Sequence, residues 1–223
     1  MEAAKHRIGG SDYVGVFATA TDKYVFLGLG LPDNNVKLLE EVLGVKSFRI
    51  TLSSSGLIGL FSRANSNGIV LSSLAFDEEL RDVKKLLPDM KVGVVESDLN
   101  AIGSNILAND RIAIVNPDFS HSEIAQIRDI LDVEVVRREI GDFKTVGANN
   151  ILTNKGFVIN NRSTDEEKEE LDKLLGFNSV RTTANKGSMA VGLSVAANSG
   201  AVVAGDSTTG FELARIVEAL EQK

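Results

Sequence analysis

Short apolar runs and polar turns alternate along this chain in a fixed order. Around "ANSNG" at 64–68, an apolar run leads into the turn and a second run, "IVLS", follows it at 69–72. Two such runs joined by an Asn- and Gly-containing turn are typical of a β-hairpin, whose tight turns use positive φ. The same arrangement surrounds "ATDK", "AND", "TNKG" and "ANSG". The pattern therefore predicts five β-hairpins, each with positive φ in its turn.

A helix is predicted after each hairpin. Three of these segments begin with Ser or Thr followed three residues later by Glu, the spacing of a capping box. The pairs are Ser120 with Glu123, Thr164 with Glu167, and Thr209 with Glu212. In "DEELRDVKKLL" the helical spacing places four apolar residues on one face, namely Leu80, Val83, Leu86 and Leu87. A third apolar stretch follows the helix, as in "SFRITL" and "KVGVVE", so each unit reads β-β-α-β.

The units repeat with a period of about 44 residues. An apolar residue followed by Gly recurs in steps of 44, 44, 44 and 45, and a Leu lies 28 residues after each of these glycines. A period of this kind indicates an array of structural repeats. The glycines are Gly15, Gly59, Gly103, Gly147 and Gly192, and the leucines are Leu43, Leu87, Leu131, Leu175 and Leu220. The repeats lie near 14–57, 58–101, 102–145, 146–190 and 191–223.

The last repeat has no third strand of its own. We expect residues 1–13 to complete it, with "AKHRI" at 4–8 as the strand, so that the array closes into a ring. A WD40 propeller is excluded because its blades contain only strands and because this chain has no Trp. The predicted fold class is α/β: a five-fold pseudosymmetric α/β propeller, or pentein, forming a single domain over 1–223. A closed ring has no free sheet edge that needs a partner, which favours a monomer.

Composition excludes several kinds of chemistry. The net charge of −7 argues against binding nucleic acid mainly through phosphates. The chain has no Cys and only two His, so we expect no metal site, no cofactor and no catalytic residues. The nineteen uncharged residues between Lys186 and Asp206 contain the turn "ANSG" and predict two strands, not a membrane helix. The opening "MEAAKHRIGG" has no apolar signal core, and we expect a cytoplasmic protein.

Several stretches resemble the archaeal and eukaryotic translation initiation factor 6 family. They are "TANKGSMAVG", "AANSGAVVAGDSTTGFEL", "TVGANNILTNKG", "AIGSNILAND" and "DEELRDVKKLLPD". The resemblance runs over essentially the whole chain. The chain departs from it at "SSSG" (53–56), where relatives commonly have Gly-Gly-Ser, and at "GDSTTG", which is one residue longer than usual.

The resemblance implies a factor that binds the large ribosomal subunit on its inter-subunit face, beside the sarcin-ricin loop, and keeps the small subunit from joining. The implied contacts are ribosomal proteins there, with rRNA as a further contact, and the implied release partners are a GTPase and its cofactor. The residues just after the repeated Gly are expected at the docking surface. The resulting ribosome-binding residues are Gly59, Leu60, Gly103, Ser104 and Asn105.

Two other functions fit the same predicted fold. Pentein enzymes that modify guanidino groups resemble this architecture, but they use a Cys nucleophile, which this chain lacks. Asp206 or another inward carboxylate would have to carry such an activity. A repeat scaffold for other proteins is the second alternative, and it differs in that it would not select the large subunit over the small one.

Overall fold

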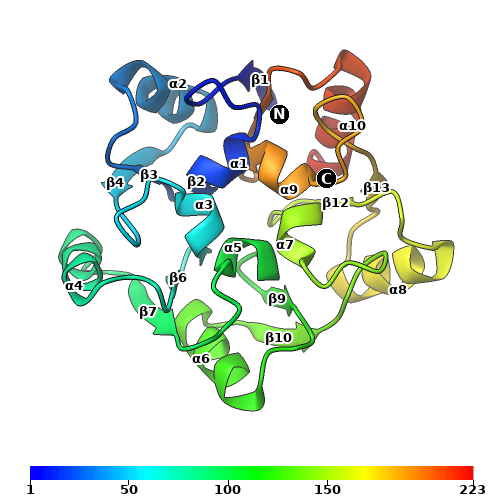
Figure 1. Ribbon diagram of the computed structural model, residues 1–223. Helices are drawn as coiled ribbons and strands as arrows, with labels where there is room; N and C mark the ends of the chain where they lie inside the picture. The colour runs from blue at the N-terminus through cyan, green and yellow to red at the C-terminus, as the bar shows by residue number, and fades with distance from the viewer. Residues whose placement is uncertain (223) are drawn as a thin grey trace.

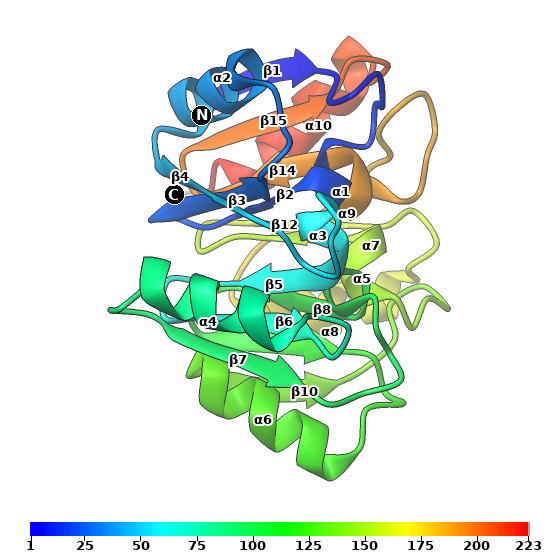
Figure 2. The ribbon, with the colours of Figure 1, turned by 60° about the vertical axis from the view of Figure 1, so that its left-hand side comes forward.

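The computed structural model describes residues 1–222 and shows five similar units arranged around a common axis (Figure 1). Within those residues, each unit contributes one three-stranded sheet and one long helix on the outside of the ring (Figure 2). The strands nearest the axis are β2 (Ala18–Ala20), β5 (Ser62–Ala64), β8 (Ile106–Ala108), β11 (Ile151–Leu152) and β14 (Val195–Ala197). The long helices are α2 (Asp33–Leu43), α4 (Asp77–Leu86), α6 (His121–Leu131), α8 (Asp165–Leu175) and α10 (Gly210–Leu220).

Each sheet combines an antiparallel hairpin with a parallel third strand. The middle strands are β3 (Tyr24–Gly28), β6 (Gly68–Ser72), β9 (Ile112–Val115), β12 (Phe157–Ile159) and β15 (Ala201–Gly205). The third strands that follow a long helix are β4 (Lys46–Ile50), β7 (Lys91–Val95), β10 (Glu134–Arg137) and β13 (Val180–Arg181). The predicted order of hairpin, helix and third strand is confirmed.

The N-terminal strand belongs to the sheet of the last unit. Strand β1 (Glu2–His6) pairs in parallel with β15, in a register that runs from Glu2 opposite Ala201 to His6 opposite Gly205. The pairing of this segment beside the last unit is confirmed, two residues earlier than the predicted 4–8. The two ends of the chain therefore share one sheet.

The long helices begin where the capping signals predict. Ser120, Thr164 and Thr209 each accept the N3 backbone N–H with their side chain, and the N3 Glu reaches back to the cap. These reciprocal bonds satisfy backbone donors that a helix start otherwise leaves unpaired. One helix face differs from the prediction: Val83 and Leu87 are buried, but Leu86 is 43% exposed.

The hairpin turns differ from the prediction in their backbone. Among the described residues, none of the five turns contains a positive φ. A side chain closes each turn instead, as where Asn65 Oδ1 accepts the N–H groups of Asn67 and Gly68. Gly68 is needed for space, since a Cβ there would lie 2.1 Å from the carbonyl oxygen of Ile130 in α6. The turn is thus packed against the helix of the next unit.

The apolar core lies between neighbouring units. Leu39 of α2 packs in one buried cluster with Val25 of β3 and with Val203 of β15, which belongs to the last unit. The five recurring leucines are all buried: Leu43, Leu87, Leu131, Leu175 and Leu220. A unit of this kind cannot bury its apolar surface alone, so its stability depends on its neighbours. Across residues 1–222, no helix is both long and apolar enough to cross a membrane.

Candidate docking surface

Each repeated glycine lies in a one-turn helix at the axis, an element that the sequence pattern did not predict. The inner helices are α1 (Val14–Phe17), α3 (Ile58–Phe61), α5 (Ile102–Asn105), α7 (Val146–Asn149) and α9 (Val191–Ser194). They lie around the axis at one end of the ring (Figure 1). The face that they form is called the axial face below.

The glycines of the inner helices are required by close packing. A Cβ on Gly59 would lie 1.8 Å from the carbonyl oxygen of Gly15, and a Cβ on Gly103 would lie 1.8 Å from that of Gly59. Real Cβ atoms do not approach a backbone oxygen so closely, and only Gly permits the approach. Gly59 and Gly103, predicted at the docking surface, are buried. They let neighbouring inner helices touch directly.

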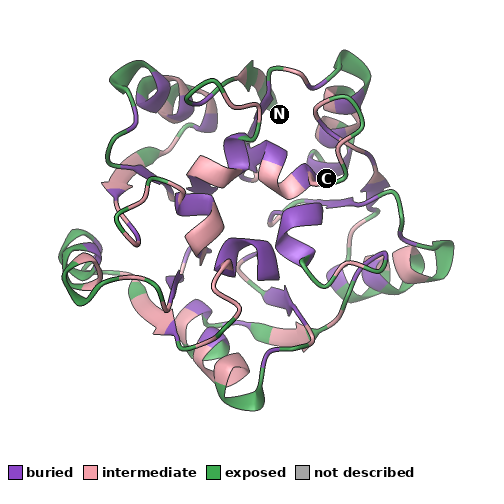
Figure 3. Cartoon of the chain, viewed as in Figure 1, coloured by how far each residue is buried: buried purple, intermediate pink, exposed green. Residues whose placement is uncertain are grey.

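Leu60 is part of an apolar group on three adjacent inner helices. Helix α1 contacts both α3 and α9, and in Figure 3 these three helices carry half-buried residues while α5 and α7 are buried throughout. The half-buried apolar residues are Val16, Phe17, Leu60, Phe61 and Leu193. Tyr13, directly before α1, and Met189, two residues before α9, are 41% and 38% exposed. We call these seven residues the axial apolar group.

Ser104 and Asn105 lie deeper than expected. Ser104 is 6% exposed and Asn105 is 5% exposed. Asn105 donates through Nδ2 to the carbonyl of Ala101 at 2.9 Å and accepts through Oδ1 from Asn116 Nδ2 at 2.8 Å. Its amide is therefore engaged inside the protein, where it ties α5 to the residue that follows β9.

The residue after the repeated Gly is partly exposed in three units and buried in the other two. Val16, Leu60 and Leu193 are half-buried, whereas Ser104 and Ala148 are buried. The sequence contains a signal for this difference, because a large apolar residue follows Gly in the first, second and fifth units and a small one follows it in the other two. The rest of the axial apolar group was missed, since the sequence pattern did not predict the inner helices that carry or adjoin it.

A repeated carboxylate fixes the loops beside the axial face. Glu79 accepts the backbone N–H groups of Ser53 and Ser54, both of which have positive φ. Glu212 accepts those of Lys186 and Gly187 in the same way. Burial acts to raise the pKa of Glu212, but its hydrogen bonds outweigh this and lower the pKa to about 2. Both carboxylates stay ionised at neutral pH and hold their loops.

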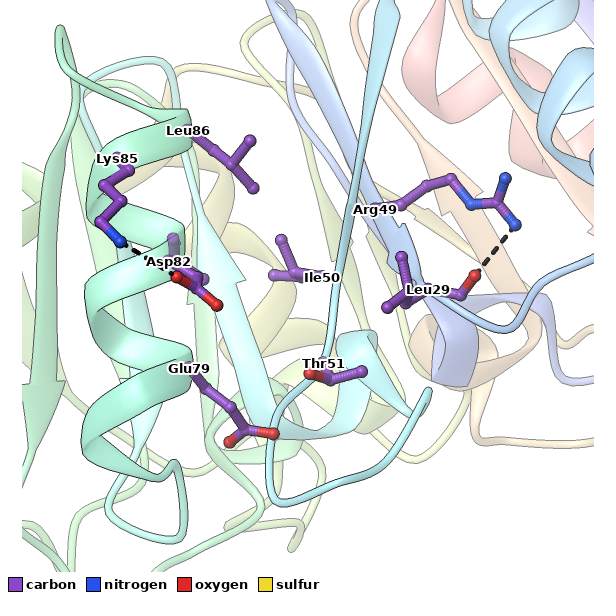
Figure 4. Close-up of a pocket in the computed structure, with 9 residues that line it drawn as sticks. Leu29, Arg49, Ile50, Thr51, Glu79, Asp82, Lys85 and Leu86 are labelled. Atoms are coloured by element: carbon purple, nitrogen blue, oxygen red, sulfur yellow. Dashed lines mark hydrogen bonds and ion pairs between the residues drawn. The ribbon is translucent and has the colours of Figure 1, made fainter.

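A pocket at the edge of the ring offers no evident chemistry. It lies between β4 and α4 and is lined by Ile50, Val83 and Leu86 together with several charged residues (Figure 4). Arg49 donates to the carbonyl of Leu29 at 2.9 Å, Lys85 pairs with Asp82 at 3.5 Å, and Glu79 holds its loop. Within residues 1–222, no cluster of three or more His, Cys, Asp or Glu could hold a metal ion.

The sequence is similar to a known protein family. A sequence model described as the eIF-6 family matches residues 3–219. The chain belongs to the eIF-6 family. Among relatives named translation initiation factor 6, that of Pyrococcus furiosus is 38% identical over 84 residues, covering 38% of this chain and 37% of the relative. That of Methanobrevibacter smithii is 43% identical over 68 residues, 30% of each chain.

These names describe translation initiation factors and not enzymes. The matched segments span about a third of the length of these eIF-6 family relatives. A solved structure of a dimethylarginine dimethylaminohydrolase variant with S-methyl-L-thiocitrulline aligns over 86% of this chain and 80% of that one, with a TM-score of 0.45 and 12% sequence identity. No functional inference follows from a similarity at that level.

Proposed function

We propose that this protein is a translation initiation factor that binds the large ribosomal subunit on its inter-subunit face and so keeps the small subunit from joining. Membership of the eIF-6 family and relatives named translation initiation factor 6 support this role. The observation that supports this binding site is the axial apolar group, in which Leu60 and its neighbours on α1, α3 and α9 are half-buried and so partly accessible.

An apolar group of this kind suits contact with another protein. Partly accessible Leu, Phe, Tyr and Met side chains supply apolar area that water need not cover once a partner packs on it. Aromatic residues and Met are also enriched in the buried centres of protein interfaces. The partner that fits best is a ribosomal protein on the large subunit beside the sarcin-ricin loop, with rRNA as a further contact at the margin.

The predicted site residues divide into two roles in this proposal. Leu60 would contact the partner directly. Gly59 and Gly103 would shape the face by letting α3 and α5 pack closely, and Asn105 would hold α5 in place through Ala101 and Asn116. Ser104, 6% exposed, would define the floor of the face between them.

The mechanism requires no chemical step. A ligand that occupies the surface needed by the small subunit multiplies the apparent dissociation constant of that subunit by one plus the ratio of the free ligand concentration to the ligand's own dissociation constant. The proposal includes a closed α/β propeller that acts as a rigid monomer in the cytoplasm, supported by the pairing of β1 with β15 and by the approach of Gly15 to Gly192. Release by a GTPase and its cofactor completes it.

Co-sedimentation with separated archaeal ribosomal subunits tests the proposal. We expect stoichiometric recovery with the large subunit and none with the small one. Re-association of the subunits at raised Mg²⁺ should then yield fewer whole ribosomes when the protein is present. Equal recovery with both subunits would favour a general scaffold, and recovery with neither would refute the proposal.

A further inference from the structure

A small cavity lies on the axis of the ring, between the inner strands. Its volume is about 40 Å³, and its lining comes from all five units. A cavity of about 10 to 15 Å³ already holds one water, so this one has room for a water-sized ion and companion waters. Each inner strand contributes the residue before its turn to the lining, and these five residues are Ala20, Ala64, Ala108, Leu152 and Ala197.

These five residues direct backbone N–H groups toward the axis. In each hairpin, the residue that follows this lining residue donates a backbone hydrogen bond across the turn. Thr21 N donates to the carbonyl of Tyr24, and Asn65 N donates to that of Gly68. In an antiparallel pair, residues bonded to the partner strand alternate with residues whose N–H and C=O point the other way. The residue before each turn therefore points both groups away from its partner strand and into the cavity.

Arg63 supplies the charge in this cavity. It lies on β5 and is one of the lining residues, and its guanidinium donates to the carbonyl of Gly103 at 2.5 Å. Its Nε is sealed from solvent and has no hydrogen-bond partner among the described residues. The described lining contains neither Asp nor Glu. Arg63 is thus the one ionised group of this described lining. Asp22 and Asp110 line the neighbouring pocket between the same inner strands, where they accept from Ser199 and Ser66.

The guanidinium is charged at neutral pH even in this setting. Burial lowers the pKa of Arg63 to about 10, which leaves it protonated in the cell. Arg63 is half-buried as a whole, but its Nε is sealed from water without a partner, and an unpaired buried donor is costly. The inward-facing backbone groups include both donors and acceptors, so they do not select a sign by themselves, but the single positive charge favours an anion.

We propose that the axial cavity is a binding site for one small monovalent anion of the chloride class. The anion accepts from Arg63 and from N–H groups of the inner strands, including those of Ala20 and Ala64. It neutralises the guanidinium and joins strands of different units. The stability of the ring consequently depends on the concentration of a halide ion.

Bromide identifies the site directly in the unaltered protein. Crystals grown without halide and soaked in sodium bromide should show an anomalous difference peak in the axial cavity, within hydrogen-bond distance of the Arg63 guanidinium. Peaks confined to the outer surface, with only water in the axial cavity, would overturn the proposal. This measurement does not depend on any variant folding.

Thermal unfolding provides a second test. At constant ionic strength, replacing bulky gluconate with chloride should raise the Tm by about 3 °C once chloride is in tenfold excess over its dissociation constant. Arg63→Met should abolish the rise. Arg49→Met is the matched control, because the Arg49 guanidinium pairs with Asp33 at 2.8 Å outside the axial cavity, and it should retain the rise. An equal rise in all three proteins would be a general salt effect and would contradict the proposal.

Discussion

A Cβ on Gly103 would lie 1.8 Å from the carbonyl oxygen of Gly59. The same relation joins Gly59 to Gly15 and recurs around the axis. Inner helices of neighbouring units therefore touch through their backbones, and a side chain at any of these glycines must push two units apart. This contact fixes the spacing of the axial face on which Leu60 lies.

Gly103→Ala should destabilise the protein by about 3 kcal/mol, because the added methyl group meets backbone atoms that cannot move aside without opening the ring. Chemical unfolding measures the loss. Gly210→Ala is the matched control, since Gly210 has nothing within 4 Å of its Cβ position and begins α10. The control should be neutral or slightly stabilising. Equal losses in both variants would contradict the packing role of Gly103.

Leu60→Glu should weaken binding to the large subunit at least tenfold, since a charge would be buried where the axial apolar group meets its partner. Its Tm should change less than its affinity, because Leu60 is only half-buried. Leu174→Glu on the outer helix α8 is the control, as Leu174 is 43% exposed and lies far from the axial face. Co-sedimentation should show a loss for the first variant alone. If Leu60→Glu instead lowers stability without affecting binding of the folded fraction, Leu60 is a core residue.

Asn105→Ala should cost about 1 to 3 kcal/mol of stability, because it removes two hydrogen bonds and leaves Asn116 Nδ2 buried without an acceptor. Asn34→Ala, at an exposed position of α2, should be nearly neutral. Urea unfolding compares the two. At a temperature where both variants are fully folded, Asn105→Ala should still bind the large subunit. Strong loss of binding by the folded variant would show that Asn105 contacts the subunit.

Glu212 should make the stability depend on acid. The pKa of Glu212 is about 2 in the folded protein, against an ordinary value of 4.5. A lowered pKa stabilises the folded state above about pH 4.5, and this contribution is lost as the pH falls toward 2. Its size is about 3 kcal/mol.

Glu212→Gln should therefore be less stable than the parent at pH 7, and the difference should disappear near pH 2. Unfolding by urea across this pH range measures both curves. The exposed Glu166→Gln on α8 should follow the parent throughout. A constant difference between Glu212→Gln and the parent at every pH would show that the carboxylate charge is not what holds the loop.

The repeat could be predicted because it shows directly in the spacing of recurring residues along the chain. A capping box such as Ser120 with Glu123 and paired apolar runs depend only on neighbours in the chain, and the period of about 44 residues appears when the chain is compared with itself. The turn at Asn65 shows where this reasoning fails. Its residues suggested positive φ, but a side-chain hydrogen bond closes the turn, and Gly68 makes room for a helix of the next unit.

The sequence by itself determined the β-β-α-β unit, its number of copies, and the placement of the first strand beside the last unit, since apolar periodicity and capping are local properties. Only the tertiary structure decided which residues face outward at the axis. Leu60 is half-buried and Asn105 is buried, although they occupy neighbouring positions in adjacent repeats. The size of the residue after Gly hints at this difference, but the exposure itself depends on how closely five glycine-bearing helices approach one another, and that distance is set by contacts between units.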